Sequence, residues 1–381
     1  MRELNNVRNW ASDIEENTRL QAERTARLDI LAGPLALMPD AHLGMGATIG
    51  SVIPTEGAII PSAVGVDIGC GMVATETDLK AGDLPDSLNP YMGTVREIIP
   101  AGVGKGHEYG PPASVLRWLR NNPRELTQKQ AAAASKQLGS LGSGNHFFEV
   151  CLDERDRVWL VLHSGSRGVG NQLAQGHIKV ARELGKQEGL EDPELMHFTQ
   201  GTPEFESYIG DMLWAQEYAR ENRRLMVAAA ILAFLEFVGK GAVTRGINCH
   251  HNFAQIETHG GQEVWITRKG AVEVQEGQYG IIPGSMGTRS YIVKGRGNPL
   301  SYNSCAHGAG RRMSRTAAKK QFTADDLRAH MEGKVWNDRD AERLIDEIPD
   351  SYKDIDQVMA DQEDLVTVEH TLSQILNFKG Q

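Results

Sequence analysis

Short apolar segments punctuated by glycine and proline alternate along this chain with longer amphipathic segments. Residues 5–30 carry scattered apolar positions between charged ones and predict an amphipathic helix. Over residues 35–79 the pattern changes to short apolar runs such as TIGSVIP and GAIIPSAVGVDIG, which predict buried strands joined by tight turns. Strand-like runs follow in HFFEVCL and VWLVLHSG, and they return over residues 241–306.

Helical patterns occupy most of the remaining sequence. Residues 113–138 and 171–240 predict helices, and the apolar run Leu225–Leu235 within the second region predicts a buried one. A further helix is expected after HGAGR, because RRMSRTAAKKQF is rich in helix formers, and it ends before a Thr323 cap. The tail is predicted to hold two more helical segments up to Lys379.

Glycine-rich pieces are distributed over the whole chain, which has 41 glycines in 381 residues, and we find no repeat, low-complexity tract or linker. This distribution predicts one interwoven α+β domain over residues 1–381. The N-terminus has no apolar segment typical of a secretory signal, and the longest apolar run is shorter than the about 20 residues that span a bilayer. We therefore expect a protein without membrane spans.

Charge and cysteine content narrow the classes of function. The formal net charge of −10 argues against sequence-independent coating of nucleic acid, although a local basic groove stays compatible with it. The four cysteines (Cys70, Cys151, Cys249 and Cys305) are widely spaced and include no CxxC pair, so a disulfide framework is not expected. A reduced, cytoplasmic setting is predicted, in which each thiol fills the core or serves as a ligand.

Several fragments place polar or ionisable residues among small residues beside an apolar strand, where enzymes often collect their functional groups. The fragments are MPDAHLGMG (Asp40, His42), VGVDIGCGM (Asp67, Cys70), LGSGNHFFEV (Asn145, His146, Glu149), VLHSGSRGVG (His163, Arg167), NCHHNFA (His250, His251, Asn252) and SCAHGAGRRMSR (His307, Arg311, Arg312). A single histidine of this kind is more often structural than functional. Asp, Cys and several His together nevertheless make a plausible convergent metal-ligand set.

The residue types in this set restrict the metal. Structural zinc sites usually take closely spaced cysteine pairs, which are absent here. One thiolate with a carboxylate and imidazoles is compatible with Mn²⁺, Fe²⁺, Co²⁺ or Zn²⁺, and it is too soft for Ca²⁺ or Mg²⁺ alone. The thiolate of Cys70 could also bridge two ions, since the neighbouring glycines leave room for their approach. The alternative for Cys70 is a small buried core thiol.

The HGAGRRMSR stretch predicts an anion site. Glycines that open a helix, followed by Arg311, Arg312 and Arg315, would bring backbone N–H groups and guanidinium groups together. The IIPGSMGTRS loop adds Ser285 in a second small-residue turn. Two such loops beside a metal set indicate a phosphate-bearing substrate. His307 could then act as base, acid or nucleophile, and the alternative is a helix-capping histidine.

Taken in order, these fragments resemble the RNA-splicing ligase RtcB family. The motifs MPDAHLGMGATIGSVIP, VGVDIGCGM, GSGNHF, LHSGSRGVGN, INCHHN, TRKGA, GIIPGSMG, HGAGR and YKDID occur in family order from about residue 38 to residue 380. The resemblance implies an RtcB-like fold with glycine-rich loops around a central metal cleft and helices outside. It implies a GTP- and Mn²⁺-dependent ligase that joins an RNA 3′-phosphate or 2′,3′-cyclic phosphate end to a 5′-hydroxyl end.

The resemblance also assigns roles by position. His307 would attack the α-phosphorus of GTP and carry GMP to the RNA 3′-phosphate, with Asp40 orienting the imidazole. The implied ligands of two Mn²⁺ ions, bridged by Cys70, are Asp67, Cys70, His146, His163 and His251. The implied guanylate contacts are Asn145, Glu149, Asn252, Ser285, Gly308, Ala309, Gly310, Arg311, Tyr352 and Lys379. Arg167 and Arg312 would contact RNA phosphate.

Two other classes of function remain open at this point. A two-metal phosphoesterase would use the same ions without a covalent nucleotide, and a non-catalytic module would only hold metal or RNA. The resemblance leaves open tRNA splicing or RNA repair as the physiological role, as well as the need for an archease-like activator. Residues 80–135 are the least family-like part of the chain.

Overall fold

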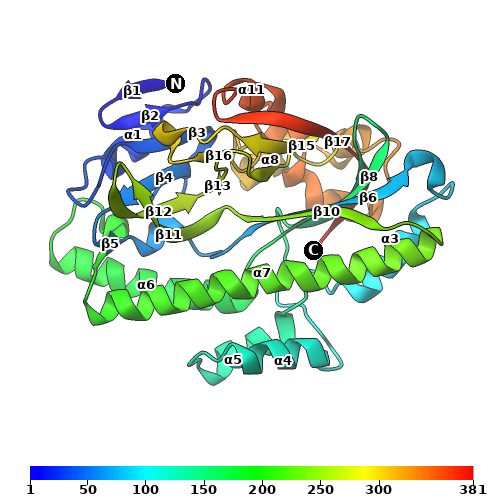
Figure 1. The fold of residues 1–381 in the computed structure, drawn as a ribbon, viewed down its shortest axis with the longest axis horizontal. Helices are drawn as coiled ribbons and strands as arrows, with labels where there is room; N and C mark the ends of the chain where they lie inside the picture. The colour runs from blue at the N-terminus through cyan, green and yellow to red at the C-terminus, as the bar shows by residue number, and fades with distance from the viewer. Residues whose placement is uncertain (381) are drawn as a thin grey trace.

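The computed structural model describes residues 1–380, which form two large β-sheets flanked by helices (Figure 1). The first sheet has six strands in the order β1 (Arg2–Leu4), β2 (Val7–Asn9), β3 (Leu35–His42), β4 (Ile49–Thr55), β12 (Gln262–Lys269) and β11 (Asn252–His259). Only the β2–β3 pair is parallel in this sheet.

The second sheet has seven strands, all paired antiparallel. Their order is β10 (Val243–His250), β6 (Gly71–Lys80), β8 (Arg157–Ser164), β7 (Phe147–Leu152), β17 (Val366–Lys379), β15 (Ser290–Gly295) and β14 (Tyr279–Ile282). Two small sheets pair β5 (Ala58–Ile59) with β9 (Phe198–Thr199) and β13 (Ala271–Glu273) with β16 (Ser304–Ala306).

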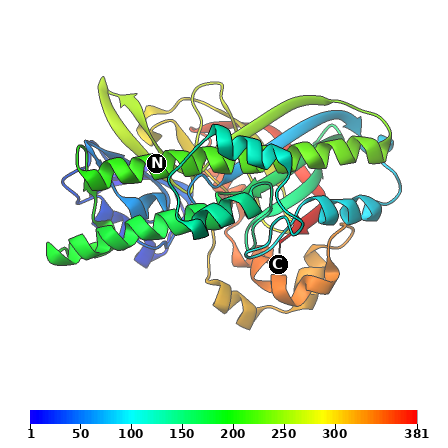
Figure 2. The ribbon, with the colours of Figure 1, turned by 90° about the horizontal axis from the view of Figure 1, so that it is seen from below.

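Helices cover the outside of the sheets. The longer ones are α1 (Glu16–Thr25), α3 (Asn89–Ile98), α4 (Ala113–Asn121), α5 (Gln128–Gln137), α6 (Arg167–Gln187) and α7 (Pro203–Val238). The short ones are α2 (Pro61–Val64), α8 (Arg315–Gln321), α9 (Ala324–His330), α10 (Ala341–Leu344) and α11 (Ile355–Ala360). Helix α7 packs on β6 and β8, and seen from below it runs beside α6 with α4 and α5 against the pair (Figure 2).

Local sequence signals define the ends of α7. The Thr202 side chain accepts a hydrogen bond from the Phe205 backbone N–H, and Pro203 occupies the first helical turn, where its missing N–H costs nothing. Gly239 ends the helix in the left-handed conformation, with φ of +80°. The predicted buried run in this helix places Met226, Ala230 and other residues in the core.

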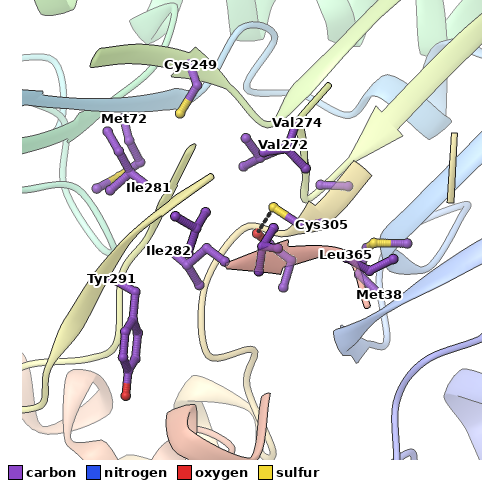
Figure 3. Packing of buried hydrophobic residues seen from close by; sticks show 14 of the residues in the cluster. Met38, Met72, Cys249, Val272, Val274, Ile281, Ile282, Tyr291, Cys305 and Leu365 are labelled. Carbon is purple, nitrogen blue, oxygen red and sulfur yellow. Dashed lines mark hydrogen bonds between the residues drawn. The ribbon is translucent and has the colours of Figure 1, made fainter. Parts of the chain in front are cut away.

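The main hydrophobic core lies between the two large sheets. Met38 of β3, Met72 of β6 and Ile282 of β14 belong to one buried cluster, together with Cys305 of the small β13–β16 sheet (Figure 3). Segments far apart in sequence therefore share one core. The structure confirms the predicted α+β class. The single domain over residues 1–381 stays a prediction.

Two element predictions were wrong. The predicted opening helix is a hairpin, β1–β2, followed by the shorter helix α1, because Asn5 and Asn6 both adopt positive φ and form a two-residue turn. The end of the tail is not helical but is β17, a central strand of the seven-stranded sheet. Alternate residues from His370 to Leu376 are buried, which is the period of a strand.

Candidate active site

One cavity of about 990 Å³ gathers most of the residues singled out by the sequence. Its lining includes Asp67, Cys70, Asn145, Glu149, His163, His251, Asn252, Ser285, His307, Gly308, Ala309, Gly310, Arg311, Tyr352 and Lys379. Side chains of both large sheets contribute to it. His146 contacts Asp67 and Cys70, and Asp40 is fully buried beside His307, so both belong to the site without lining the cavity.

Neighbouring strands of the seven-stranded sheet bring the candidate metal ligands together. Cys70 directly precedes β6 and His146 directly precedes β7, whereas His163 lies near the end of β8 and His251 follows β10. Because adjacent strands are antiparallel, the starts of β6 and β7 meet the ends of β8 and β10 at one edge. The pairing of His163 with Met72 fixes this register.

The ligand atoms form two groups that share one sulfur. Cys70 Sγ lies 3.4 Å from His146 Nε2 and 3.3 Å from His163 Nε2. His146 Nε2 is also 3.0 Å from Asp67 Oδ2, and His163 Nε2 is 2.9 Å from His251 Nε2. Within each group, one with Asp67 and His146 and one with His163 and His251, all candidate ligand atoms lie within 4.8 Å of one another. The arrangement suits two cations that share a thiolate.

Burial sets the protonation of these groups. It lowers the pKa of His163 and of His251 well below the usual histidine value, so both imidazoles are neutral and can offer a lone pair. Burial, with the nearby Asp67 carboxylate, raises the pKa of the Cys70 thiol. Burial also raises the pKa of Asp67, but the hydrogen bond with His146 and further interactions outweigh it and hold that pKa at about 2.

Hydrogen bonds outside the ligand groups orient two of the candidate ligands, His163 and Asp67. His163 Nδ1 lies 3.0 Å from the Asn145 carbonyl oxygen, to which it donates its proton, so the lone pair of Nε2 points toward the thiol. The Ser166 backbone N–H donates to Asp67 Oδ1 at 3.2 Å. His163 and Asp67 are thus held with coordinating atoms directed to the centre. The Nδ1 atoms of His146 and His251 are buried and have no hydrogen-bond partner among residues 1–380. The residues present therefore fit a metal centre of mixed nitrogen, sulfur and oxygen ligands.

Arg223 of α7 binds the backbone next to the candidate metal ligands. Its side chain is fully buried, and NH1 donates to the Gly69 carbonyl at 2.7 Å and to the Ser164 carbonyl at 3.1 Å. Its Nε donates to Asn248 Oδ1 at 3.0 Å. The guanidinium therefore connects the loop before Cys70 with the ends of β8 and β10.

Replacing Arg223 by methionine is expected to lower the free energy of unfolding by about 3 kcal/mol, because several buried acceptors lose their donors. Denaturant unfolding measures this change. The matched control is Arg220→Met on the same helix, where the side chain is 57% exposed and lies 3.7 Å from Glu217. This control should shift the free energy of unfolding by less than about 0.5 kcal/mol. Equal effects of the two substitutions would contradict a supporting role for Arg223.

His307 lies between Asp40 and the metal ligands. Asp40 Oδ2 accepts hydrogen bonds from the backbone N–H groups of His307 at 3.0 Å and Gly308 at 3.2 Å, and it lies 2.6 Å from His307 Nδ1. The ring centroid of His307 is 4.8 Å from that of His251. Gly270 allows this approach, because a Cβ there would lie 2.9 Å from His307 Cε1 and its φ is +66°. Asp40 thus anchors the backbone at His307 and lies beside Nδ1, which leaves Nε2 for chemistry.

A second part of the cavity is organised around Glu347, which the sequence analysis missed. Lys379 Nζ donates to Glu347 Oε2 at 2.7 Å and to the Gly144 carbonyl at 3.2 Å. The Tyr352 hydroxyl donates to Glu347 Oε2 at 3.0 Å and accepts from Arg311 NH1 at 2.9 Å. Only the position of Glu347 shortly before the YKDID motif hints at this role.

Charges in this part balance one another. Burial raises the pKa of Glu347, but Lys379 and Arg315 outweigh it, so this pKa is about 2 and the carboxylate is ionised. Glu149 differs, because burial raises its pKa to about 8 despite the nearby Lys379 and the hydrogen bond from Asn377. The cavity therefore contains one carboxylate, Glu347, that stays ionised, and a second, Glu149, that takes up a proton near neutral pH.

Lys269 is a second residue that the sequence analysis did not assign. Its ammonium group donates to the Ser62 carbonyl at 2.8 Å and to the Met45 carbonyl, and burial lowers its pKa to about 7. It lines the cavity close to the metal ligands. In the sequence, only the position of Lys269 within the TRKGA motif could have indicated a place in the site.

The two predicted RNA-binding arginines lie outside the lining of the main cavity. Arg167 donates to Ser140 Oγ at 3.2 Å and to the Gly102 carbonyl at 3.0 Å. Arg312 lines a separate cavity of about 100 Å³ together with Lys353. Their roles stay predictions.

The predicted helix after HGAGR is present, but it begins four residues later than the end of that motif. Helix α8 begins at Arg315, with Ser314 as its cap, and Arg311 instead forms a β-bridge with Tyr352. The glycines therefore do not open a helix, and the predicted convergence of helix N–H groups on an anion is absent from these residues. Gly310 has φ of +74°, and a Cβ there would lie 2.2 Å from the Asp40 carbonyl oxygen.

The chain has an α+β fold, two candidate ligand groups that share one thiol, and a histidine beside a buried carboxylate. These features are typical of a metal-dependent enzyme. Comparison with known proteins makes the assignment specific. A family model described as tRNA-splicing ligase RtcB matches residues 21–120 and 113–380. The chain is 46% identical over 401 residues to the RNA-splicing ligase RtcB of Escherichia coli (strain K12), covering 98% of this chain and 97% of that protein.

More distant relatives match with similar coverage. The tRNA-splicing ligase RtcB of Nanoarchaeum equitans is 29% identical, with 93% of this chain and 90% of that protein covered. The RNA-splicing ligase RtcB of Mycobacterium tuberculosis is 29% identical, with 89% and 95% covered. The chain belongs to the RtcB family of RNA ligases. The predicted family and ligase class are therefore confirmed.

Among residues 1–380, no helix is long and apolar enough to cross a membrane.

Proposed function

We propose that this protein joins an RNA 3′-phosphate or 2′,3′-cyclic phosphate end to a 5′-hydroxyl end, with GTP as co-substrate and two Mn²⁺ ions. The observation that carries this proposal is His307. Its Nδ1 lies 2.6 Å from a fully buried carboxylate, and its ring adjoins the candidate ligand His251. A histidine held in this way is suited to act as a nucleophile.

The candidate ligand groups would hold the two ions through Asp67, Cys70, His146, His163 and His251. Bound ions would offset phosphate charge and polarise the P–O bonds. All four cysteines are free thiols in the structure. A reducing compartment such as the cytoplasm would keep Cys70 available for this role.

His307 performs the first chemical step in this proposal. Its Nε2 lone pair forms a bond to the α-phosphorus of GTP, and the bond from that phosphorus to the pyrophosphate oxygen breaks. Asp40 stabilises the positive charge that develops on the imidazole, because its carboxylate lies beside Nδ1. The product is a phosphoramidate that links GMP to His307.

Two transfers then complete ligation. An oxygen of the RNA 3′-phosphate displaces His307 from the GMP phosphorus and forms an RNA–GMP anhydride. The 5′-hydroxyl oxygen attacks the activated 3′-phosphate, loses its proton and displaces GMP. A cyclic end is first opened by water to the 3′-phosphate. The free imidazole of His307 is restored when GMP passes to the RNA 3′-phosphate, so the protein can act on another GTP.

The part of the cavity around Glu347 is the proposed guanylate site. Guanine presents O6 and N7 as acceptors, which match the ammonium of Lys379. The lining also offers Asn145, Asn252, Ser285 and the backbone of residues 308–310. The ligase mechanism requires a site for guanine, and this part of the cavity would supply it.

Incubation of the wild type with GTP and Mn²⁺ tests the proposal. Intact-mass spectrometry should find one guanylate added per chain, and the adduct should be lost in acid, as phosphoramidates are. Incubation with EDTA supplies the control. Hydrolysis of a 2′,3′-cyclic phosphate oligonucleotide without any adduct, whichever divalent ion is supplied, would replace the ligase mechanism by a two-metal phosphoesterase.

A further inference from the structure

One arm of the cavity is not used by the proposed guanylate and metal sites. We call it the α6 arm, and its lining consists of Leu43, Met45, Gln175, Ile178, Lys179 and Arg182. The first two residues belong to the loop between β3 and β4, and the other four lie on α6. The arm is continuous with the metal ligands, because all these residues line the same cavity.

The loop of the α6 arm is held rigidly through its backbone. Gln21 Nε2 donates to the carbonyls of Gly44 at 2.7 Å and Gly46 at 2.8 Å, and Gln21 Oε1 accepts from the Gly44 N–H at 3.0 Å. Lys269 Nζ donates to the carbonyl of Met45. The side chains are nevertheless exposed, 53% for Leu43 and 73% for Met45. Rigid presentation of exposed apolar side chains at the rim of a cavity is typical of a ligand contact.

Helix α6 supplies the opposite wall and a cation. Gln175, Ile178, Lys179 and Arg182 occupy positions i, i+3, i+4 and i+7 of the helix, so they share one face, which extends for about 10 Å at 1.5 Å per residue. Arg182 Nε pairs with Glu194 at 2.5 Å. Lys179 is exposed and forms no ion pair within 4.0 Å among residues 1–380, and Glu183 lies one turn further along α6. The ammonium group is therefore available at the rim of a cavity in a chain of net charge −10, which favours an anionic ligand.

We propose that the α6 arm receives the RNA strand that ends in the 3′-phosphate. Lys179 contacts a backbone phosphate of this strand, and Leu43 and Met45 contact a base near its end. The inference rests on the proposed function, in which this strand is the first to meet the guanylated His307. Helix α6 begins beside Asp67, so a strand that lies along the helix delivers its terminal phosphate to the metal ligands.

The phosphate contact is tested by fluorescence anisotropy with a single-stranded RNA that carries a 3′-phosphate, in the presence of Mn²⁺ and without GTP. Lys179→Gln should weaken binding and reduce the slope of log Kd against log salt concentration by about one. The matched control is Lys129→Gln on α5, where the lysine is exposed and lies outside the cavity lining. This control should bind as the wild type does, and melting temperatures report on folding.

The base contact predicts a different signature. Met45→Ser should weaken binding about fivefold without changing the salt slope, because it removes an apolar contact and no charge. Its control is Leu232→Ser on α7, a position that is 71% exposed and outside the cavity. Wild-type affinity in both Lys179→Gln and Met45→Ser would overturn the inference. The inference would also be overturned if the two substitutions weakened binding of a 5′-hydroxyl strand but not of the 3′-phosphate strand. A wild type that forms no GMP adduct refutes the proposed function separately.

Discussion

His307→Ala is expected to take up no guanylate from GTP, whereas the wild type takes up one per chain. The reason is that the proposed bond to phosphorus forms at the imidazole, and alanine offers no nucleophile. The substitution should leave the fold intact, because Asp40 Oδ2 keeps its hydrogen bonds from the backbone N–H groups of residues 307 and 308. Intact-mass spectrometry after incubation with GTP and Mn²⁺ measures the adduct.

The control for this experiment is His330→Ala. His330 pairs with Asp350 on the surface, 2.7 Å away, and does not line the cavity. It should form the adduct as the wild type does. If His307→Ala still acquires a full guanylate, the nucleophile lies elsewhere. The nearest candidates are then His251, at 4.8 Å between ring centroids, and His42, at 6.5 Å.

Cys70→Ala is expected to abolish tight binding of Mn²⁺ and, with it, formation of the GMP adduct. The two ligand groups share this sulfur, so one substitution removes a ligand from both. Native mass spectrometry or elemental analysis of the dialysed protein counts the ions. We expect two per chain in the wild type and fewer than one in the variant, since loss of ligands or their supports costs orders of magnitude in affinity.

The matched control is Cys151→Ala. Cys151 is a fully buried thiol in β7 that belongs to neither ligand group. Its replacement leaves a small cavity in the core and should cost about 1 kcal/mol in stability, but it should not change the number of bound ions. Two ions per chain in Cys70→Ala would show that the sulfur is a core thiol and not a bridging ligand.

Many of the helices and strands could be predicted, because hydrophobic periodicity and helix caps depend only on residues close in the sequence. The strands β7 and β8 coincide with HFFEVCL and VWLVLHSG, and Thr323 caps α9 as expected. The failures came where a local pattern was ambiguous. The tail after Val366 can be read as helix or strand until its pairing with β7 and β15 is known.

The sequence by itself determined which chemical groups are available. The motifs supply a thiol, carboxylates and imidazoles at strand ends beside glycines, and their order along the chain identifies the family. These properties are local, because they depend on residue type and on near neighbours. The two missed residues, Lys269 and Glu347, lie in or shortly before the TRKGA and YKDID motifs, but only their place in the cavity indicates what they do.

Only the tertiary structure decided which groups meet. Asp67, His146, His163 and His251 are spread over almost 200 positions, yet antiparallel pairing of β10, β6, β8 and β7 brings them to one sulfur. The same holds for His307, which directly follows β16, and Asp40, which lies in β3 of the six-stranded sheet. The physical reason is that strand pairing and core packing are long-range interactions. Their geometry is set by the whole buried core and not by any segment alone.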